Sequence, residues 1–289
     1  MSILEAVVLG VVQGLTEFLP ISSTAHMRIV PSLLGWSTPT AAFEAVVQCG
    51  TLAAVVAVMW RDVRAIAGAF IEAVGRVRPW ADPEARVGLF IVVGTLPIVA
   101  VGLAFKELIK GPLRALESIV VALGAATLAM ALAEWVAWRR SRAGKPTRDG
   151  LTVLRLADSL AVGCAQALAL VPGTSRSGIT ISAGMLRGLD RRTAARFSFL
   201  LSLPAIAAAA VLELAEEWRD ILGTPQARAA LLAGTLAATL TGYLAIRWLL
   251  RLLTSHTLWP FVAYRIVLAA LLAAWLLAGH AAPTGTAGG

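Results

Sequence analysis

The sequence contains little that could build a metal centre or a disulfide framework: two cysteines and three histidines among 289 residues. Cys49 and Cys164 both lie within apolar stretches without metal-ligand spacing, which predicts two buried thiols and supports neither a disulfide nor a zinc site. The stretch 1–19 contains Glu5 but no lysine or arginine. A removable signal peptide begins with basic residues, so we expect the first helix to belong to the mature protein.

Charged side chains are also scarce, at 15% of residues, whereas 58% are hydrophobic and the mean hydropathy is +0.79. Apolar runs of about 18 to 22 residues match the thickness of the bilayer hydrocarbon core. The net charge of +8 comes from basic residues that cluster in loops between apolar segments, as the positive-inside bias of membrane proteins predicts. The sequence therefore predicts a helical protein with several membrane spans, in contact with the bilayer and with no nucleic-acid partner.

Some apolar stretches have full spanning length, and two do not. The stretches 2–35 and 153–189 are each interrupted midway by proline and a cluster of serine and threonine, which predicts two half-length helices joined by a turn. The predicted full spans cover residues 42–60, 87–105, 115–138, 197–215, 228–247 and 259–279. The expected fold is all-α, with about six full spans and two re-entrant helical hairpins.

The two halves of the chain share a pattern of spaced residues. Four residues of the first hairpin recur at the same spacing in the second: Gly10, Gln13, Leu15 and Ser22 match Gly163, Gln166, Leu168 and Ser175. A later pair of glycines also recurs, since Gly94 and Gly102 match Gly234 and Gly242. A unit of one hairpin and three spans would thus be duplicated, and because three is odd the second unit enters from the opposite face. We expect one integral-membrane domain with inverted repeats over 1–138 and 153–279, a basic cytoplasmic linker at 139–152 and a flexible tail at 281–289.

Loop charges give the expected orientation. The segments 61–86, 139–148 and 187–196 are basic and fall on one side of this topology, whereas 216–220 (EEWRD) is mainly acidic. The basic side should be cytoplasmic, which places both termini and the loop 216–227 outside.

The first hairpin carries polar side chains at its tip. Gln13 and Glu17 are four residues apart and share one helix face, one turn before the break at Pro20. The hydroxyls of 22–24 (SST) are natural N-caps for the returning helix, and His26 lies in its first turn. Free amides and the helix dipole make such a helix start attractive to an anion.

The second hairpin has an equivalent tip. Pro172 and Gly173 predict the turn, Thr174 or Ser175 caps the next helix, and Arg176 offers a bidentate partner for phosphate oxygens. If the repeat holds, the two helix starts face each other, and a diphosphate fits between them.

Each of these residues also has a structural interpretation. A serine or threonine in a membrane helix usually bonds to nearby backbone, and an isolated arginine snorkels toward headgroups. The clustering of hydroxyls with Glu17, His26 and Arg176 favours a site instead. Glu44 and Gln48 form another pair four residues apart, which either lines the same cavity or bonds between helices.

These strings resemble the integral-membrane undecaprenyl-diphosphate phosphatases, also called bacitracin-resistance proteins. The resemblance is carried by 10–20 (GVVQGLTEFLP), 22–26 (SSTAH), 43–48 (FEAVVQ) and 172–178 (PGTSRSG), and extends to 197–201 (FSFLL), Pro260 with Phe261, and Tyr264 with Arg265. It implies a bacterial inner-membrane enzyme that removes the terminal phosphate of undecaprenyl diphosphate, with its site open to the periplasm. The product would be the monophosphate carrier lipid of cell-wall synthesis, and the activity would confer bacitracin resistance.

By position, the family motifs place Glu17, Ser23, His26, Ser175 and Arg176 in the active site. We expect Glu17, Ser23, His26 and Arg176 to be catalytic. The residues expected to bind substrate are Gln13, Ser22, Thr24, Gly173, Thr174, Ser175, Ser177, Glu44 and Gln48. The family often has glutamate in place of Gln13, so this chain keeps one carboxylate in that motif, and it usually has glycine in place of Ala25.

The sequence leaves the nucleophile open. Either Ser23 attacks with His26 or Glu17 as base, or His26 attacks to form a phosphohistidine, or a water attacks directly. Arg176 and the two helix starts would stabilise charge on the transferring phosphoryl group. Mg²⁺ or Ca²⁺ bridging the diphosphate oxygens is compatible with this chemistry, but no protein metal cage and no organic cofactor is expected.

The strongest rival function is a transporter or flippase of a phosphorylated lipid, because inverted repeats with broken helices are common in transporters. It predicts binding of the lipid without hydrolysis. A phosphatidate-phosphatase type of site would need a Pro-Ser-Gly-His string, and a prenyltransferase would need Asp-rich motifs. The sequence has neither.

Overall fold

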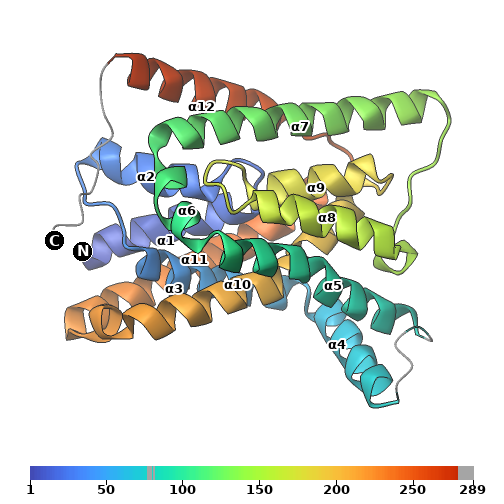
Figure 1. The fold of residues 1–289 in the computed structure, drawn as a ribbon, viewed down its shortest axis with the longest axis horizontal. Helices are drawn as coiled ribbons and strands as arrows, with labels where there is room; N and C mark the ends of the chain where they lie inside the picture. Colours follow the sequence, from blue (N-terminus) through green and yellow to red (C-terminus); the bar gives the residue numbers. More distant parts are fainter. Residues whose placement is uncertain (77–79, 81, 279–289) are drawn as a thin grey trace.

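The computed structural model describes residues 1–76, 80 and 82–278, and α-helices dominate them (Figure 1). The longer helices are α1 Ile3–Phe18, α2 Ser23–Leu34, α3 Ala41–Val58, α4 Trp60–Gly75, α5 Pro83–Ala104, α7 Leu116–Arg142, α8 Leu156–Leu168, α9 Arg176–Leu186, α10 Arg191–Leu222, α11 Pro225–Leu252 and α12 Trp259–Leu277. The short elements are α6 Lys106–Lys110 and two 3-10 turns, Pro112–Arg114 and Leu151–Val153. The all-α class is confirmed for these residues.

Among the described residues, five helices are long and apolar enough to cross a membrane: α5, α7, the Arg191–Glu213 part of α10, α11 and α12. They confirm five of the six predicted spans. The sixth, predicted over 42–60, corresponds to α3, which meets the same criteria only together with α4, at a bend of 86°. Arg61, Asp62 and Arg64 follow the bend directly, and charged side chains leave the hydrocarbon region where they can. The segment 61–86, expected as a basic loop, therefore contains a helix, α4.

Other predicted loops are also shorter than expected. α7 continues through Arg142 and α10 begins at Arg191, so both basic segments there are partly helical. α10 also continues to Leu222, which leaves Gly223 and Thr224 as the connection to α11 where a loop over 216–227 was predicted. These helices run past the hydrophobic stretch because helix propensity does not end where lipid contact does. The predicted tail, 281–289, lies outside the described residues.

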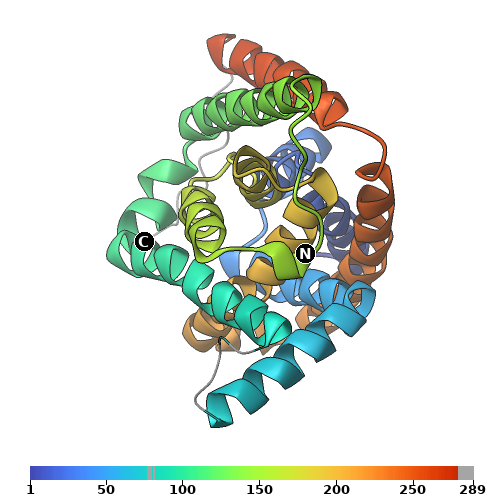
Figure 2. The same ribbon diagram turned by 90° about the vertical axis from the view of Figure 1, so that its right-hand side faces the viewer.

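Both predicted hairpins are present as pairs of half-length helices. α1 ends at Phe18, two residues before Pro20, and α2 returns from Ser23. α8 ends at Leu168 and α9 returns from Arg176 after a turn that contains Pro172. In Figure 2 the hairpin of α8 and α9, in yellow-green, is surrounded by longer helices. Glu17 and Ser22 at the first tip and Ser175 at the second are buried, so both tips are enclosed by protein.

The residues matched between the two halves also pack in a matched way. Gly10 on α1 lies against Gly234 on α11, where an added Cβ would be 2.1 Å from the Gly234 carbonyl oxygen. Gly163 on α8 lies against Gly94 on α5, where a Cβ would be 2.3 Å from the Gly94 carbonyl oxygen. Each hairpin thus packs its first helix against a span of the other half. The repeat boundaries themselves stay a prediction.

Ion pairs hold the basic end of the molecule together. Buried Asp158 accepts from Arg148 at 2.6 Å and from Arg187 at 3.1 Å, and the hydrogen bond from Arg148 to Asp158 raises the pKa of Arg148. Buried Glu134 on α7 accepts from Arg191 on α10 and from the Leu258 amide before α12.

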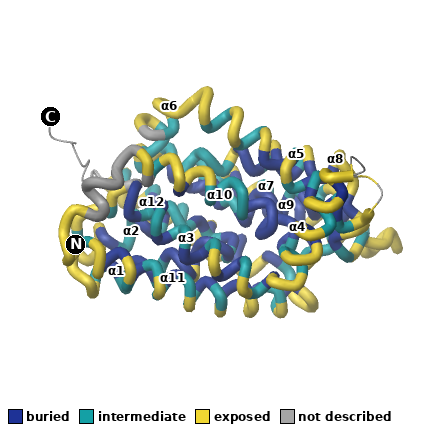
Figure 3. The backbone as a smooth tube through the Cα atoms, turned by 90° about the horizontal axis from the view of Figure 1, so that it is seen from below, coloured by how far each residue is buried: buried dark blue, intermediate teal, exposed yellow. Residues whose placement is uncertain are grey.

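Buried residues form the interior of the bundle, and exposed turns form its outside (Figure 3).

One prediction about the cysteines was wrong. Cys49 is half-buried and Cys164 is exposed, and both are free thiols. Cys164 lies on the outward face of α8, in a groove between α8 and α5 with α6. An apolar sequence context therefore indicated contact with lipid at this position, because a membrane protein exposes apolar faces.

Candidate active site

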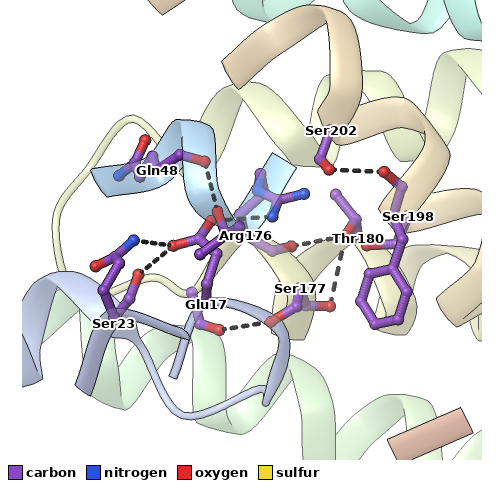
Figure 4. Close-up of polar contacts among 12 residues, drawn as sticks. Glu17, Ser23, Gln48, Arg176, Ser177, Thr180, Ser198 and Ser202 are labelled. Atoms are coloured by element: carbon purple, nitrogen blue, oxygen red, sulfur yellow. Dashed lines mark hydrogen bonds and ion pairs between the residues drawn. The ribbon is translucent and has the colours of Figure 1, made fainter. Parts of the chain in front are cut away.

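Glu17 is the centre of a polar cluster between the two hairpin tips. Its Oε2 accepts hydrogen bonds from Gln13 Nε2 and from Ser23 Oγ, each at 2.8 Å. Its Oε1 accepts from Arg176 Nη2 at 3.0 Å. The side chain of Glu17 is 6% exposed and that of Arg176 is 11% exposed. This ion pair joins the end of α1 to the start of α9, and Figure 4 shows Ser23 and Arg176 on opposite sides of Glu17.

A serine with a strained backbone precedes each returning helix, Ser22 before α2 and Ser175 before α9, and we call these two residues the serine corners. Ser22 has φ 76° and Ser175 has φ 69°, in the left-handed region that residues other than glycine rarely adopt. The two serines are equivalents in the predicted repeat. Ser175 Oγ caps α9 by accepting from the Gly178 amide at 3.2 Å. Ser22 stands at the N-cap of α2 but makes no capping bond, and its hydroxyl pairs with Thr24 Oγ1 at 3.2 Å.

Direct hydrogen bonds connect the two tips. The Gly173 amide donates to Thr24 Oγ1 at 3.0 Å, and Ser177 Oγ donates to the Leu19 carbonyl at 3.2 Å. Gly173 has φ 96°, and an added Cβ would lie 2.3 Å from the Ile119 carbonyl oxygen. Only glycine fits this position, since both the conformation and the close approach to α7 require it.

His26 uses both ring nitrogens. Nδ1 lies 2.7 Å from the Ser22 carbonyl oxygen, and Nε2 lies 2.6 Å from the Tyr264 hydroxyl. A carbonyl only accepts, so Nδ1 carries the proton, and in a neutral ring Nε2 then accepts from Tyr264. The two rings stack with centroids 5.8 Å apart. His26 therefore holds the Ser22 corner, while Ser23 hydrogen-bonds to Glu17.

A fully buried arginine on α12 contacts the second tip. Nη2 of Arg265 donates to the carbonyls of Gly173 and Thr174, at 3.3 and 3.1 Å. Sequence reasoning used Tyr264 and Arg265 only as marks of the resemblance and did not place them in the site. The sequence did contain an indication that Arg265 is functional, because an arginine inside the apolar stretch 259–279 is costly unless it has a function.

Comparison with known proteins identifies the family. A family model described as bacitracin resistance protein BacA matches residues 6–271. The chain belongs to this family. Proteins named undecaprenyl-diphosphatase are similar over nearly their whole length. The one from Chlorobium phaeovibrioides is 46% identical over 283 residues (98% of this chain, 100% of the relative), and the one from Chlorobaculum tepidum is 45% identical with the same coverage. The one from Prosthecochloris aestuarii is 44% identical over 280 residues (97% and 99%).

In this BacA family member, most of the predicted site residues come together. Glu17 directly contacts both Ser23 and Arg176, and the two tips share hydrogen bonds through Thr24 and Ser177. Gln48 lies beside the ion pair of Glu17 and Arg176 in Figure 4. Glu44 lies one turn earlier on α3, within electrostatic range of Arg114, Arg28 and Glu17. Thr174 is buried and its carbonyl faces Arg265, so Ser175 and not Thr174 caps α9.

An apolar groove runs beside the second tip. It has a volume of about 590 Å³ and lies between α7 and the turn after α8. Its walls include Ala122, Ala125 and Ala129 of α7, with Val171 and Thr174 of the turn. The groove is thus continuous with the turn that carries Gly173 and Arg176.

The carboxylate of the polar cluster is that of Glu17. Glu17 already accepts from three donors, and no group of three or more His, Cys, Asp or Glu side chains suited to a metal occurs in the described part of the chain. Mg²⁺ is usually held by one or two carboxylates together with substrate phosphates. The donor set fits a cation that enters with a diphosphate.

Proposed function

We propose that this protein hydrolyses undecaprenyl diphosphate to undecaprenyl phosphate and inorganic phosphate. It would thereby recycle the carrier lipid of bacterial cell-wall synthesis and confer resistance to bacitracin. The observation that carries the proposal is Glu17 held between the Ser23 hydroxyl and the Arg176 guanidinium, where two helix starts meet. The names of the relatives support the same reaction.

Ser23 is the proposed nucleophile and Glu17 its base, because Ser23 Oγ donates directly to Glu17 Oε2. The serine oxygen forms a bond to the terminal phosphorus while the bond from phosphorus to the bridging oxygen breaks. The bonding pair leaves with undecaprenyl phosphate, and the serine proton passes to Glu17. Nη1 of Arg176 has no hydrogen-bond partner among the described residues, so it is available to the phosphoryl oxygens.

Water completes the reaction. It attacks the phosphoserine, the bond from phosphorus to Ser23 Oγ breaks, and Glu17 returns its proton to the serine oxygen. Inorganic phosphate leaves with the protons of the water. His26 supports this step indirectly, since its bond to the Ser22 carbonyl holds the corner that precedes Ser23.

A divalent cation, Mg²⁺ or Ca²⁺, is proposed to enter with the substrate, bound by the diphosphate itself. Such a cation would neutralise charge on the diphosphate oxygens. Activity should fall in EDTA and return when either cation is added, and full activity in EDTA would contradict this part of the proposal.

The groove between α7 and the second tip is proposed to hold the first isoprene units of the lipid. Its alanine walls are apolar, and Val171 and Thr174 connect it to the site. Replacing Ala125 by phenylalanine should raise KM for a C15 and for a C55 prenyl diphosphate, because both carry the first isoprene units. An unchanged KM for either substrate would contradict this assignment.

The proposed orientation has the hairpin tips toward the outside of the inner membrane. The basic ends of α7, α9 and α10 lie at the right-hand side of Figure 1, away from the tips. Basic residues favour the cytoplasm. In a chain without Cys49 and Cys164, a cysteine at Gly223 should react with an impermeant thiol reagent from outside, and one at Lys145 should not.

Trapping of a phosphoenzyme tests the chemistry. Purified protein given prenyl diphosphate labelled at the terminal phosphate should carry acid-stable label after rapid quenching, and the Ser23→Ala variant should not. Ser159→Ala is the matched control, because Ser159 is a buried hydroxyl that bonds to the Phe90 carbonyl away from the tips. Label that persists in Ser23→Ala would exclude Ser23 as nucleophile. Binding of the lipid without phosphate release would support the transporter instead.

A further inference from the structure

Arg265 is a cation buried without a charged partner in its hydrogen bonds. It is fully buried on α12, and its hydrogen-bond acceptors are four neutral oxygens: Thr127 Oγ1 and the carbonyls of Leu123, Gly173 and Thr174. Its Nη1 has no hydrogen-bond partner among the described residues. Burying a cation in this way is unfavourable, and such residues persist in membrane helices where function requires them.

Other buried ionic contacts of this protein are arranged differently. Arg191 donates to the carboxylate of Glu134, and Arg148 donates to the carboxylate of Asp158. Both pairs stabilise the basic end, away from the hairpin tips. Arg265, in contrast, donates to neutral oxygens of α7 and of the second tip.

The contacts of Arg265 determine how the turn presents its peptide groups. Because the Thr174 carbonyl points to Arg265, the Ser175 amide on the same trans peptide points the opposite way. Ser175 follows with its strained φ of 69°, and Arg176 begins α9. A strained conformation persists only where its surroundings enforce it. The hydrogen bonds to Arg265 supply that constraint.

The neighbouring residue acts on the other tip. Tyr264 contacts Nε2 of His26, and Nδ1 of His26 contacts the carbonyl of Ser22, the other strained serine. Two adjacent residues of α12 therefore hold the two corners, Tyr264 through His26 and Arg265 directly. α12 sets the geometry of both helix starts.

We propose that Arg265 is a positioning residue of the diphosphate site. Its guanidinium holds the carbonyls of Gly173 and Thr174 on one side of the turn, and so fixes Ser175 and Arg176 on the other. Its charge adds to the attraction of the site for a diphosphate. This inference rests on the proposed function for its substrate, but the hydrogen bonds that carry it do not depend on hydrolysis.

The test compares Arg265→Gln and Arg265→Lys in the purified full-length protein, with Arg191→Gln as the matched control. Arg191 is a partly buried arginine that, like Arg265, donates to α7, but to Glu134, seven residues beyond Thr127. The measurements are the melting temperature, KM and kcat with a C15 prenyl diphosphate, and the Kd of methylenediphosphonate, a diphosphate analogue that phosphatases do not cleave.

Arg265→Gln should raise KM and the Kd of methylenediphosphonate about tenfold and lower kcat about 100-fold. Arg265→Lys keeps the charge but cannot donate to both carbonyls in the same geometry. KM should therefore recover, while kcat stays about tenfold below that of the wild type. Arg191→Gln should lower the melting temperature without changing KM or Kd.

A partly unfolded population lowers kcat but leaves KM and Kd unchanged. Unchanged KM and Kd in Arg265→Gln would therefore overturn the proposal. Full recovery of kcat in Arg265→Lys would also overturn it, because it would show that only the positive charge of Arg265 matters and not its hydrogen bonds to the turn. Equal shifts of Kd in Arg191→Gln and Arg265→Gln would also overturn it. If the wild type binds methylenediphosphonate but releases no phosphate, the hydrolytic function fails, and the comparison of Kd values still decides the role of Arg265.

Discussion

Replacing Glu17 by glutamine should abolish most of the activity and leave the fold intact. The glutamate and glutamine side chains have nearly identical shapes, but one carboxylate oxygen becomes an NH₂ group. If that group faced Arg176, two donors would oppose each other, so the amide oxygen must take the Arg176 side. The NH₂ group then faces Gln13 and Ser23, and the Ser23 hydroxyl must accept where it now donates. A hydroxyl held in this way is not deprotonated by its neighbour.

The size of the loss follows from the role of a general base. Loss of such a group lowers kcat by about 100-fold to 10,000-fold, equal to about 3 to 5 kcal/mol of transition-state stabilisation. KM should change little, because Arg176 remains and gains freedom to bind phosphate. The assay is steady-state phosphate release from a C15 prenyl diphosphate by detergent-purified protein.

Glu134→Gln is the matched control. It removes the same charge from another buried carboxylate, which binds Arg191 and the Leu258 amide at the basic end. It should lower the melting temperature and leave kcat of the folded protein close to that of the wild type. A Glu17→Gln protein that keeps more than about a tenth of the wild-type kcat would refute the role of Glu17 as base.

Three further substitutions test the packing that places the site. Gly10→Ala should destabilise the protein by about 1 to 3 kcal/mol, because the new methyl group meets the backbone of Gly234, whereas Gly124→Ala, which faces open space, should be neutral in a thermal unfolding assay. Gly173→Ala should abolish phosphate release, while Gly150→Ala, at a glycine with a similar positive φ and no atom in the way of a Cβ, should retain it; activity in Gly173→Ala would contradict the close approach to α7. Asp158→Asn should lower the free energy of unfolding by about 1 to 3 kcal/mol, since two arginines lose their buried partner, and an unchanged melting temperature would contradict this.

The sequence predicted the hairpins because their breaks are local. Pro20 and Pro172 interrupt apolar stretches that are otherwise long enough to span, and serine-rich strings follow each break. Helix length and apolar composition likewise identified α5, α7, α10, α11 and α12. These features depend on residues close together in the chain, which is why composition and spacing were sufficient.

Contacts across the fold were harder to predict. The bond from Ser23 to Glu17 spans six residues and followed from the hairpin, but the bond from Gly173 to Thr24 spans 149 residues and depends on how the two tips meet. Arg265 was missed for the same reason: its partners lie on α7 and on the second turn, far from α12 in sequence. The bend after α3 was missed because α4 is amphipathic, and its charges resembled a loop.

The decisive measurement is phosphate release from undecaprenyl diphosphate by the purified wild-type protein and by its Arg176→Ala variant. We predict release by the wild type and a loss of about 100-fold or more in a folded Arg176→Ala protein, because the variant lacks the guanidinium that joins the two tips and faces the transferring phosphoryl group. A well-folded wild type that binds the lipid diphosphate but releases no phosphate, or an Arg176→Ala variant with wild-type turnover, would contradict it.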